Sequence, residues 1–224
     1  MQKLLKTMPS TIDEAFKTIL KRIEQLEANS AATARQTLTW VYYAQRPLKM
    51  DELLEALSVE ENDRDRKDNT NNAISVIDCC LSFVTHDEAS GDVRFVHPSV
   101  QRWFDSEPQQ KWLFPELYLA KICLTYLCFD IFENKVDEWK SSNRSSYIFY
   151  HYAAQCWGGH TRRAEDDPTI QRSALAFLES ENKRNYMLRV AHTLDYYLTR
   201  QSALHICAGN GLEGLCRILL NADW

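Results

Sequence analysis

Residues able to act as nucleophiles or metal ligands come first, because this sequence of 224 residues holds seven cysteines and six histidines. Cys156 lies between His151 and His160 at spacings that allow a thiolate–imidazole pair, but adjacent turns of one helix explain these spacings equally well. No cysteine and histidine pairs are spaced as in zinc sites, and Cys79 and Cys80 are adjacent. The glycines form no phosphate-binding loop, dinucleotide motif or nucleophile elbow. We therefore expect a protein that is not an enzyme and needs no cofactor and no metal.

Composition and charge narrow the class of protein further. Hydrophobic residues make up 45% of the chain and charged residues 25%, as in ordinary globular proteins. The net charge of −5 argues against a nucleic-acid partner, which usually requires a basic face. The odd number of cysteines, all within apolar runs, favours buried free thiols in a reducing compartment. No signal peptide and no apolar run of roughly 20 residues is visible, so we expect a cytoplasmic protein without a membrane partner.

The secondary-structure elements that would position the cysteines and histidines begin with a series of helices. Apolar spacing predicts helices over 12–26, with Ser10 as the cap, and over roughly 31–45, separated by a break at 28–30. A short helix over 50–57 and a helix over 73–81 follow, on either side of a polar loop. Two β-type runs, 83–86 and 93–96, are joined by a turn with Gly91 and followed by a helix that starts at Pro98. This order of elements, helices followed by a β-hairpin, is that of a winged helix-turn-helix.

The residues of the helix before the hairpin indicate whether this winged helix could bind DNA. A DNA-reading helix needs Arg, Lys, Asn or Gln on its outer face, whereas 73–81 holds neither Arg nor Lys and carries Asp78. The turn of the hairpin is acidic, which phosphates would repel. A protein-packing module is therefore favoured, and a winged-helix nucleic-acid-binding factor is the alternative.

Two groups of apolar residues further along are predicted to be core. Helix-packing core is favoured over a peptide groove for an aromatic cluster formed by Trp139, Tyr147, Phe149, Tyr150, Tyr152 and Trp157. A stripe of Leu215, Ile218, Leu219 and Leu220 is likewise expected in the core, not as a cofactor box.

The segments 9–14, 46–48, 52–57 and 94–100 resemble the winged-helix segment of fungal NACHT–ankyrin proteins of the STAND class, a domain also named after GPI inositol-deacylase. The segment 202–207 resembles the start of an ankyrin repeat. The resemblance implies a mainly α fold: a winged helix with a small β-hairpin over 1–106, an all-α helical linker over 107–200, and a single partial ankyrin repeat over 201–224.

The resemblance also implies roles for single residues. His97 would contact the diphosphate held by a neighbouring NTPase domain, whereas a hydrogen bond within its own turn is the simpler interpretation. Leu204, His205 and Gly211 would be structural residues of the ankyrin repeat, with Gly211 in the turn between its helices.

The function implied is that of a non-enzymatic regulatory segment, which couples ligand sensing by ankyrin repeats to an NTPase switch. Its partners would be the NTPase domain or further ankyrin repeats, in cis or in trans. One repeat cannot bury its own apolar face, so it must dock on the preceding helices or on other repeats. Apolar surface that stays uncovered also makes self-association an expectation.

Overall fold

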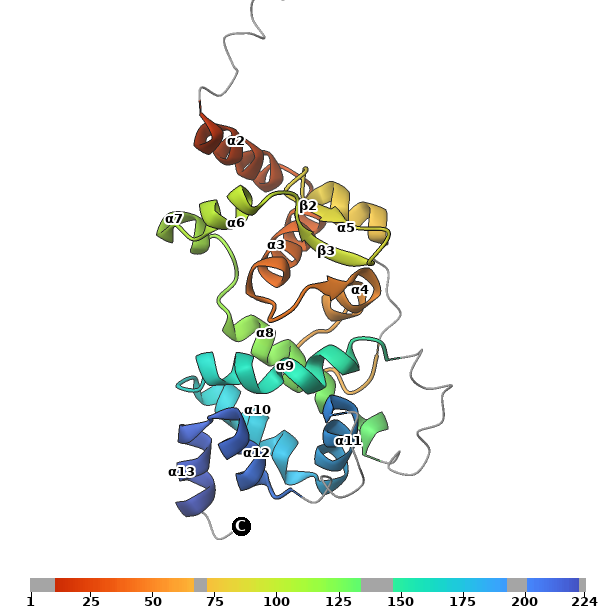
Figure 1. Ribbon diagram of the computed structural model, residues 1–224, viewed down its shortest axis with the longest axis vertical. Coiled ribbons are helices and arrows are strands. Elements are labelled where there is room, and N and C mark those ends of the chain that lie inside the picture. Colours follow the sequence, from red (N-terminus) through yellow and green to blue (C-terminus); the bar gives the residue numbers. More distant parts are fainter. Residues whose placement is uncertain (1–10, 67–71, 134–146, 193–200, 222–224) are drawn as a thin grey trace, which may run out of the picture. The chain divides into compact units, whose positions relative to one another are not determined.

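The computed structural model describes residues 11–66, 72–133, 147–192 and 201–221. It is mainly helical with one small antiparallel sheet (Figure 1), as the sequence predicts. The chain divides into two compact units: the described residues of Met1–Met50 and Asn71–Phe114 form the first, and those of Asp51–Thr70 and Pro115–Trp224 form the second. The domain ranges expected from the sequence stay predictions.

Helices of the first unit begin where side chains can cap them. Thr11 caps the first of them by accepting a hydrogen bond from the Glu14 amide at 3.2 Å, whereas the predicted cap Ser10 lies outside the described residues. The break expected at 28–30 is wrong, because these residues form the first turn of the next helix. The helices of this unit are α2 (Ile12–Glu24), α3 (Ala28–Tyr43), α5 (Ala73–Cys79), α6 (Pro98–Phe104) and α7 (Glu107–Gln110).

The sheet has three short strands in the order β1-β3-β2: β1 (Leu48–Lys49), β2 (Val84–His86) and β3 (Asp92–Phe95). Gly91 has a φ of 75°, a conformation that glycine adopts without strain, and it closes the turn between β2 and β3. The sequence did not predict β1, which is followed directly by α4 (Met50–Leu57). The order α3-β1-α4-α5-β2-β3 is that of a winged helix.

Aromatic rings form much of the core of the first unit. Phe83 and Phe104 are buried with their ring centroids 5.8 Å apart, and Phe16 of α2 packs edge-on against Phe83 at 5.7 Å. Trp103 lies against the same rings, and its indole N–H donates to Asp13 at 2.8 Å. The closing helix α6 thereby packs against α2, far away in the sequence.

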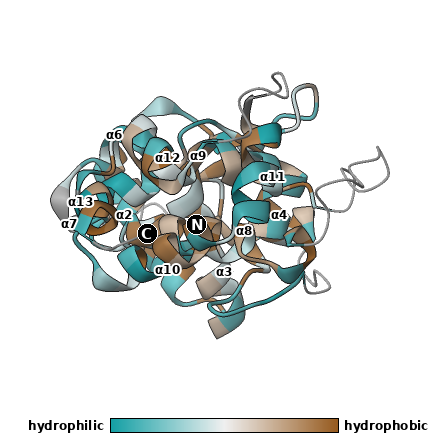
Figure 2. Cartoon of the chain, turned by 90° about the horizontal axis from the view of Figure 1, so that it is seen from below, coloured by the Kyte–Doolittle hydropathy of each residue, from teal (hydrophilic) through white to brown (hydrophobic). Residues whose placement is uncertain are grey.

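The second unit is a helical assembly around α8 and α9 (Figure 1). It contains α8 (Leu117–Leu127), the 3-10 helix η1 (Asp130–Phe132), α9 (Tyr150–Arg163), α10 (Pro168–Glu179), α11 (Glu181–His192), α12 (Ala203–Asn210) and α13 (Glu213–Asn221), together with most of α4. The helices carry both apolar and polar residues in Figure 2, as expected for helices that bury one side.

Most of the predicted core residues of this unit are buried. Buried members of the aromatic cluster are Phe149, Tyr150, Tyr152 and Trp157, while Tyr147 is half-buried and Trp139 lies outside the described residues. In α13, Leu215 and Leu219 are buried and Ile218 is half-buried. The prediction for Leu220 is wrong: its side chain is 68% exposed, because a helix turns about 100° per residue and moves it off the face of Leu219.

Candidate functional site

The hairpin of the winged helix offers no unpaired cation in its turn. Lys49 lies beside the hairpin and contacts the Asp92 carboxylate and the Ser90 carbonyl, both at 2.7 Å. Arg94 pairs with Asp87 at 2.8 Å. The backbone N–H of Ser90 holds the pKa of Asp87 below its ordinary value, and the Lys49 ammonium does the same for Asp92. Both cations at the wing are therefore paired with one of its aspartates.

The outer face of α5 is apolar and acidic. Asn72 caps the helix by accepting from the Ser75 amide at 2.8 Å, which orients a helix of only seven residues. Val76 and Cys79 are buried, so the exposed face carries Ile74, Ser75 and Asp78. Ile74 is 74% exposed. A large exposed isoleucine next to a carboxylate suits contact with a protein surface better than contact with phosphates.

His97 caps the helix that follows the hairpin. Its Nδ1 accepts from the Ser99 amide at 3.1 Å and lies 2.8 Å from the Ser99 hydroxyl, while Pro98 occupies the first turn of α6. The imidazole is exposed. The hydrogen bond of His97 within its own turn, the simpler interpretation of the sequence, is thus present. The contact of His97 with a bound diphosphate stays a prediction.

The last two helices form a short hairpin that contains the predicted ankyrin residues. Ser202 caps α12, and its hydroxyl lies 2.7 Å from Nδ1 of His205, which is itself exposed. Gly211 ends α12 in the left-handed conformation, with φ at 67°, and lets the chain turn into α13. Leu204 is half-buried. The positions of His205, Leu204 and Gly211 fit the predicted helix–turn–helix unit, whose ankyrin identity stays a prediction.

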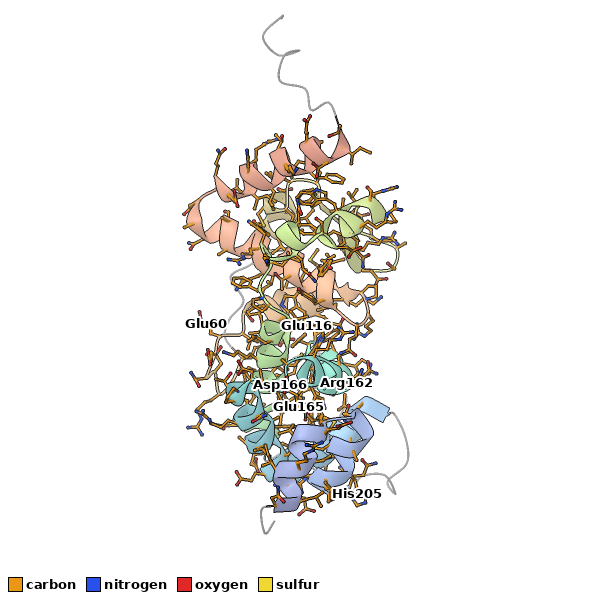
Figure 3. All side chains as sticks on the ribbon, turned by 90° about the vertical axis from the view of Figure 1, so that its left-hand side faces the viewer. Glu60, Glu116, Arg162, Glu165, Asp166 and His205 are labelled. Atoms are coloured by element: carbon orange, nitrogen blue, oxygen red, sulfur yellow. The ribbon has the colours of Figure 1, made fainter. Side chains whose placement is uncertain are left out.

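Docking of this hairpin on α9 uses contacts that sequence reasoning missed. A methyl group added to Gly158 would collide with the Asn210 side chain at the end of α12, so only glycine allows this close approach. Glu165 lies just beyond α9 and accepts from the Leu215 amide at 2.9 Å, which caps α13 from outside. Arg162 lies alongside Gly211, and Figure 3 shows Arg162 and Glu165 at one end of α9 next to the hairpin. The one signal of this contact in the sequence was a pair of adjacent glycines within a stretch whose pattern predicts a helix. A glycine inside a helix often marks a close packing contact.

A series of polar groups links the start of α8 to α9, and its inner members Tyr152 and His160 are buried. The Tyr152 hydroxyl lies 2.9 Å from Nε2 of His160, and Nδ1 of His160 lies 3.5 Å from the Glu116 carboxylate, which also pairs with Arg163. Burial acts to raise the pKa of Glu116, but the hydrogen bonds with His160 and Arg163 outweigh it and lower the pKa. Tyr152 and His160 have no exposed surface, so these polar groups hold the helices together rather than contact a substrate.

The dyad considered for Cys156 does not form with His160. Both ring nitrogens of His160 face other groups, Tyr152 and Glu116, and the Cys156 side chain is buried. All seven cysteines are free thiols. Within the described residues, no group of three His, Cys, Asp or Glu side chains could hold a metal ion. Along the same residues, no helix combines the length and apolarity needed to cross a membrane.

Comparison with known proteins supports the winged-helix part of the chain. Residues 21–112 match the family model of the winged helix domain of GPI inositol-deacylase. No curated protein and no solved structure matches the chain. The matched residues run from α2 through α7 and include all three strands. Element order and family match agree that this part of the chain is a winged helix domain.

Proposed function

We infer that the chain is a non-enzymatic regulatory and protein-interaction segment of a NACHT–ankyrin type signalling NTPase. The observation that carries this proposal is the surface of the winged helix, where α5 exposes Ile74 beside Asp78 and the cations of the wing are ion-paired. Such a surface suits an apolar protein contact rather than a nucleic acid. The match to a winged helix domain supports the same function.

In this proposal the last helical hairpin carries the signal of the ankyrin repeats to the helices before it. Specific contacts of Gly158 and Glu165 with α12 and α13 support this role, because a shift of the hairpin would disturb α9 directly. Allosteric coupling requires that each state makes different contacts, and these two contacts would differ if the hairpin moved. The free thiols are consistent with the proposed cytoplasmic location. The exposed side chain of Leu220 is consistent with self-association or with a further repeat that covers it.

The proposed NTPase partner is tested by a binding experiment in trans. The purified chain is titrated with a separately produced NACHT domain, with wild type compared against Ile74→Glu. We expect Ile74→Glu to weaken binding, and Ile12→Glu serves as the control because Ile12 is 68% exposed in the same unit. Equal binding by all three proteins would contradict the role of α5. Binding to duplex DNA that weakens steeply with salt would instead favour the nucleic-acid alternative.

The proposed role of His97 needs a longer version of the chain that carries the NTPase domain. His97→Asn is the informative variant, because asparagine can still cap α6 and therefore preserves the fold. We expect His97→Asn to bind nucleoside diphosphate more weakly than wild type. Equal diphosphate affinity of the two proteins would mean that His97 serves only as the helix cap.

A further inference from the structure

Two free thiols lie together at the end of α5. Cys79 is the last residue of this helix and Cys80 follows as its C-cap. Both sulfur atoms lie close to the Val76 carbonyl oxygen, at 3.2 and 3.3 Å, so they face the same side of the helix end. A hydrogen bond between the two thiols lowers the pKa of Cys79 below its ordinary value and raises that of Cys80. The pair therefore offers two neighbouring sulfur ligands to one bound atom.

The spacing of the two cysteines favours a shared ligand over a disulfide. Adjacent Cα atoms are about 3.8 Å apart, whereas the Cα atoms of a disulfide usually lie about 4.4 to 6.8 Å apart. A disulfide between Cys79 and Cys80 would therefore distort the backbone at the end of α5. An atom that bonds to both sulfurs makes the bridge longer and removes this conflict.

A buried hydroxyl lies beside the two thiols. Thr37 of α3 is next to Cys80, and its Oγ1 is buried without a hydrogen-bond partner among the described residues. A buried hydroxyl in this state costs free energy that a bound group could recover. The site thus combines two soft sulfur ligands with one position for a hydrogen bond to a ligand. It holds too few ligands for an ordinary metal centre, because no group of three His, Cys, Asp or Glu side chains occurs in the described part of the chain.

The turn that follows the thiols gives a route to them. Leu81 and Ser82 have φ of 46° and 71°, the left-handed conformation that costs free energy in residues other than glycine. Ser82 is exposed, whereas Cys79 is 8% exposed and Cys80 is fully buried. A strained turn at the surface opens at a low cost in free energy, so a small molecule can reach the sulfurs there.

We propose that Cys79 and Cys80 form a binding site for trivalent arsenic, taken up as arsenous acid. Two As–S bonds form and two As–O bonds break, the thiol protons leave with the two hydroxyl groups as water, and no electrons are transferred. Trivalent arsenic is thiophilic and holds its three ligands in a pyramid, which suits two sulfurs that face the same side. Its remaining hydroxyl group bonds to Thr37. Arsenous acid is uncharged near neutral pH, so its entry buries no charge. This inference is independent of the proposed function.

The test measures binding of arsenous acid to the full chain by mass spectrometry under native conditions. We expect the wild type to take up one arsenic atom. Cys79→Ala and Cys80→Ala should each bind about a hundredfold more weakly, because a single sulfur loses the gain of attachment at two points. Cys207→Ala is the matched control, since it removes a buried thiol from the other unit and should bind like the wild type.

Two further measurements make the test specific for the folded site. Thr37→Val keeps the shape of threonine and should weaken binding about fivefold, the size of one hydrogen bond; equal affinity would overturn the contact with Thr37. Arsenous acid should raise the urea concentration at which the wild type unfolds, because a ligand of the native state stabilises it. The proposal is overturned if the wild type takes up no arsenic, if Cys79→Ala and Cys80→Ala bind as the wild type does, or if arsenous acid fails to raise the urea midpoint.

Discussion

Substituting Gly158 by alanine should loosen the last helical hairpin, although alanine is the better helix former. The added methyl group would lie against the Asn210 side chain, with the Asn210 Cβ at 2.9 Å. Rotation of the Asn210 side chain would move its amide away but not its Cβ. The rotation would also break the hydrogen bond that the amide donates to the Ile206 carbonyl at 2.9 Å. The clash therefore has to be relieved by a shift of α12 away from α9.

The size of the effect follows from two opposing contributions. Overpacking in a filled contact costs about 2 kcal/mol, and replacing a glycine within a helix gains about 1 kcal/mol. The net loss of about 1 kcal/mol corresponds to an about fivefold larger open population of the hairpin. In an Asn210→Gly background the clash is absent, so the same substitution should become stabilising by about 1 kcal/mol.

The assay is native-state hydrogen exchange over α12 and α13, read by mass spectrometry. We expect exchange to rise about fivefold in Gly158→Ala and to fall when Gly158→Ala is added to Asn210→Gly. Gly209→Ala is the matched control, since no atom lies near the position of its added methyl group, and it should slow exchange. Unchanged exchange in Gly158→Ala, or the same increase in both backgrounds, would refute the steric explanation.

Three further predictions concern buried or capping groups. Glu165→Ala should speed hydrogen exchange at the Leu215 amide by removing a cap worth about 1 kcal/mol, and Glu165→Gln, which keeps an acceptor oxygen, should not. Burial raises the pKa of Glu55 above its ordinary 4.5, so the stability of the wild type falls as pH rises through the raised pKa. Glu55→Gln can still accept from the Phe149 amide, so its urea stability relative to wild type should increase from pH 4 to pH 8; a difference that stays constant with pH would contradict this. Burial raises the pKa of Cys207 to about 12, so a thiol reagent at pH 8 should label it far more slowly in native than in urea-unfolded protein, as mass spectrometry of labelled peptides would show.

Local signals in the sequence determined much of the fold. Gly91 and Gly211 mark the turns that require a positive φ, and Pro98 marks the first turn of α6. The order of helices and hairpin, and the acidic wing, were also readable from residue types. These features depend on neighbours within a few residues, so propensity and capping rules are sufficient to find them.

Only the tertiary structure decided which distant segments meet. Strand β1 is two residues long and becomes a strand because β3 pairs with it, so no local pattern marks it. Glu55 accepts from the Phe149 amide across 94 residues, and Gly158 meets Asn210 only because α12 lies against α9. Periodicity gives a helix its apolar face but does not say which element will cover it, as the exposed Leu220 shows. Such pairings depend on the complementary shapes of packed surfaces, which form only when the whole chain has folded.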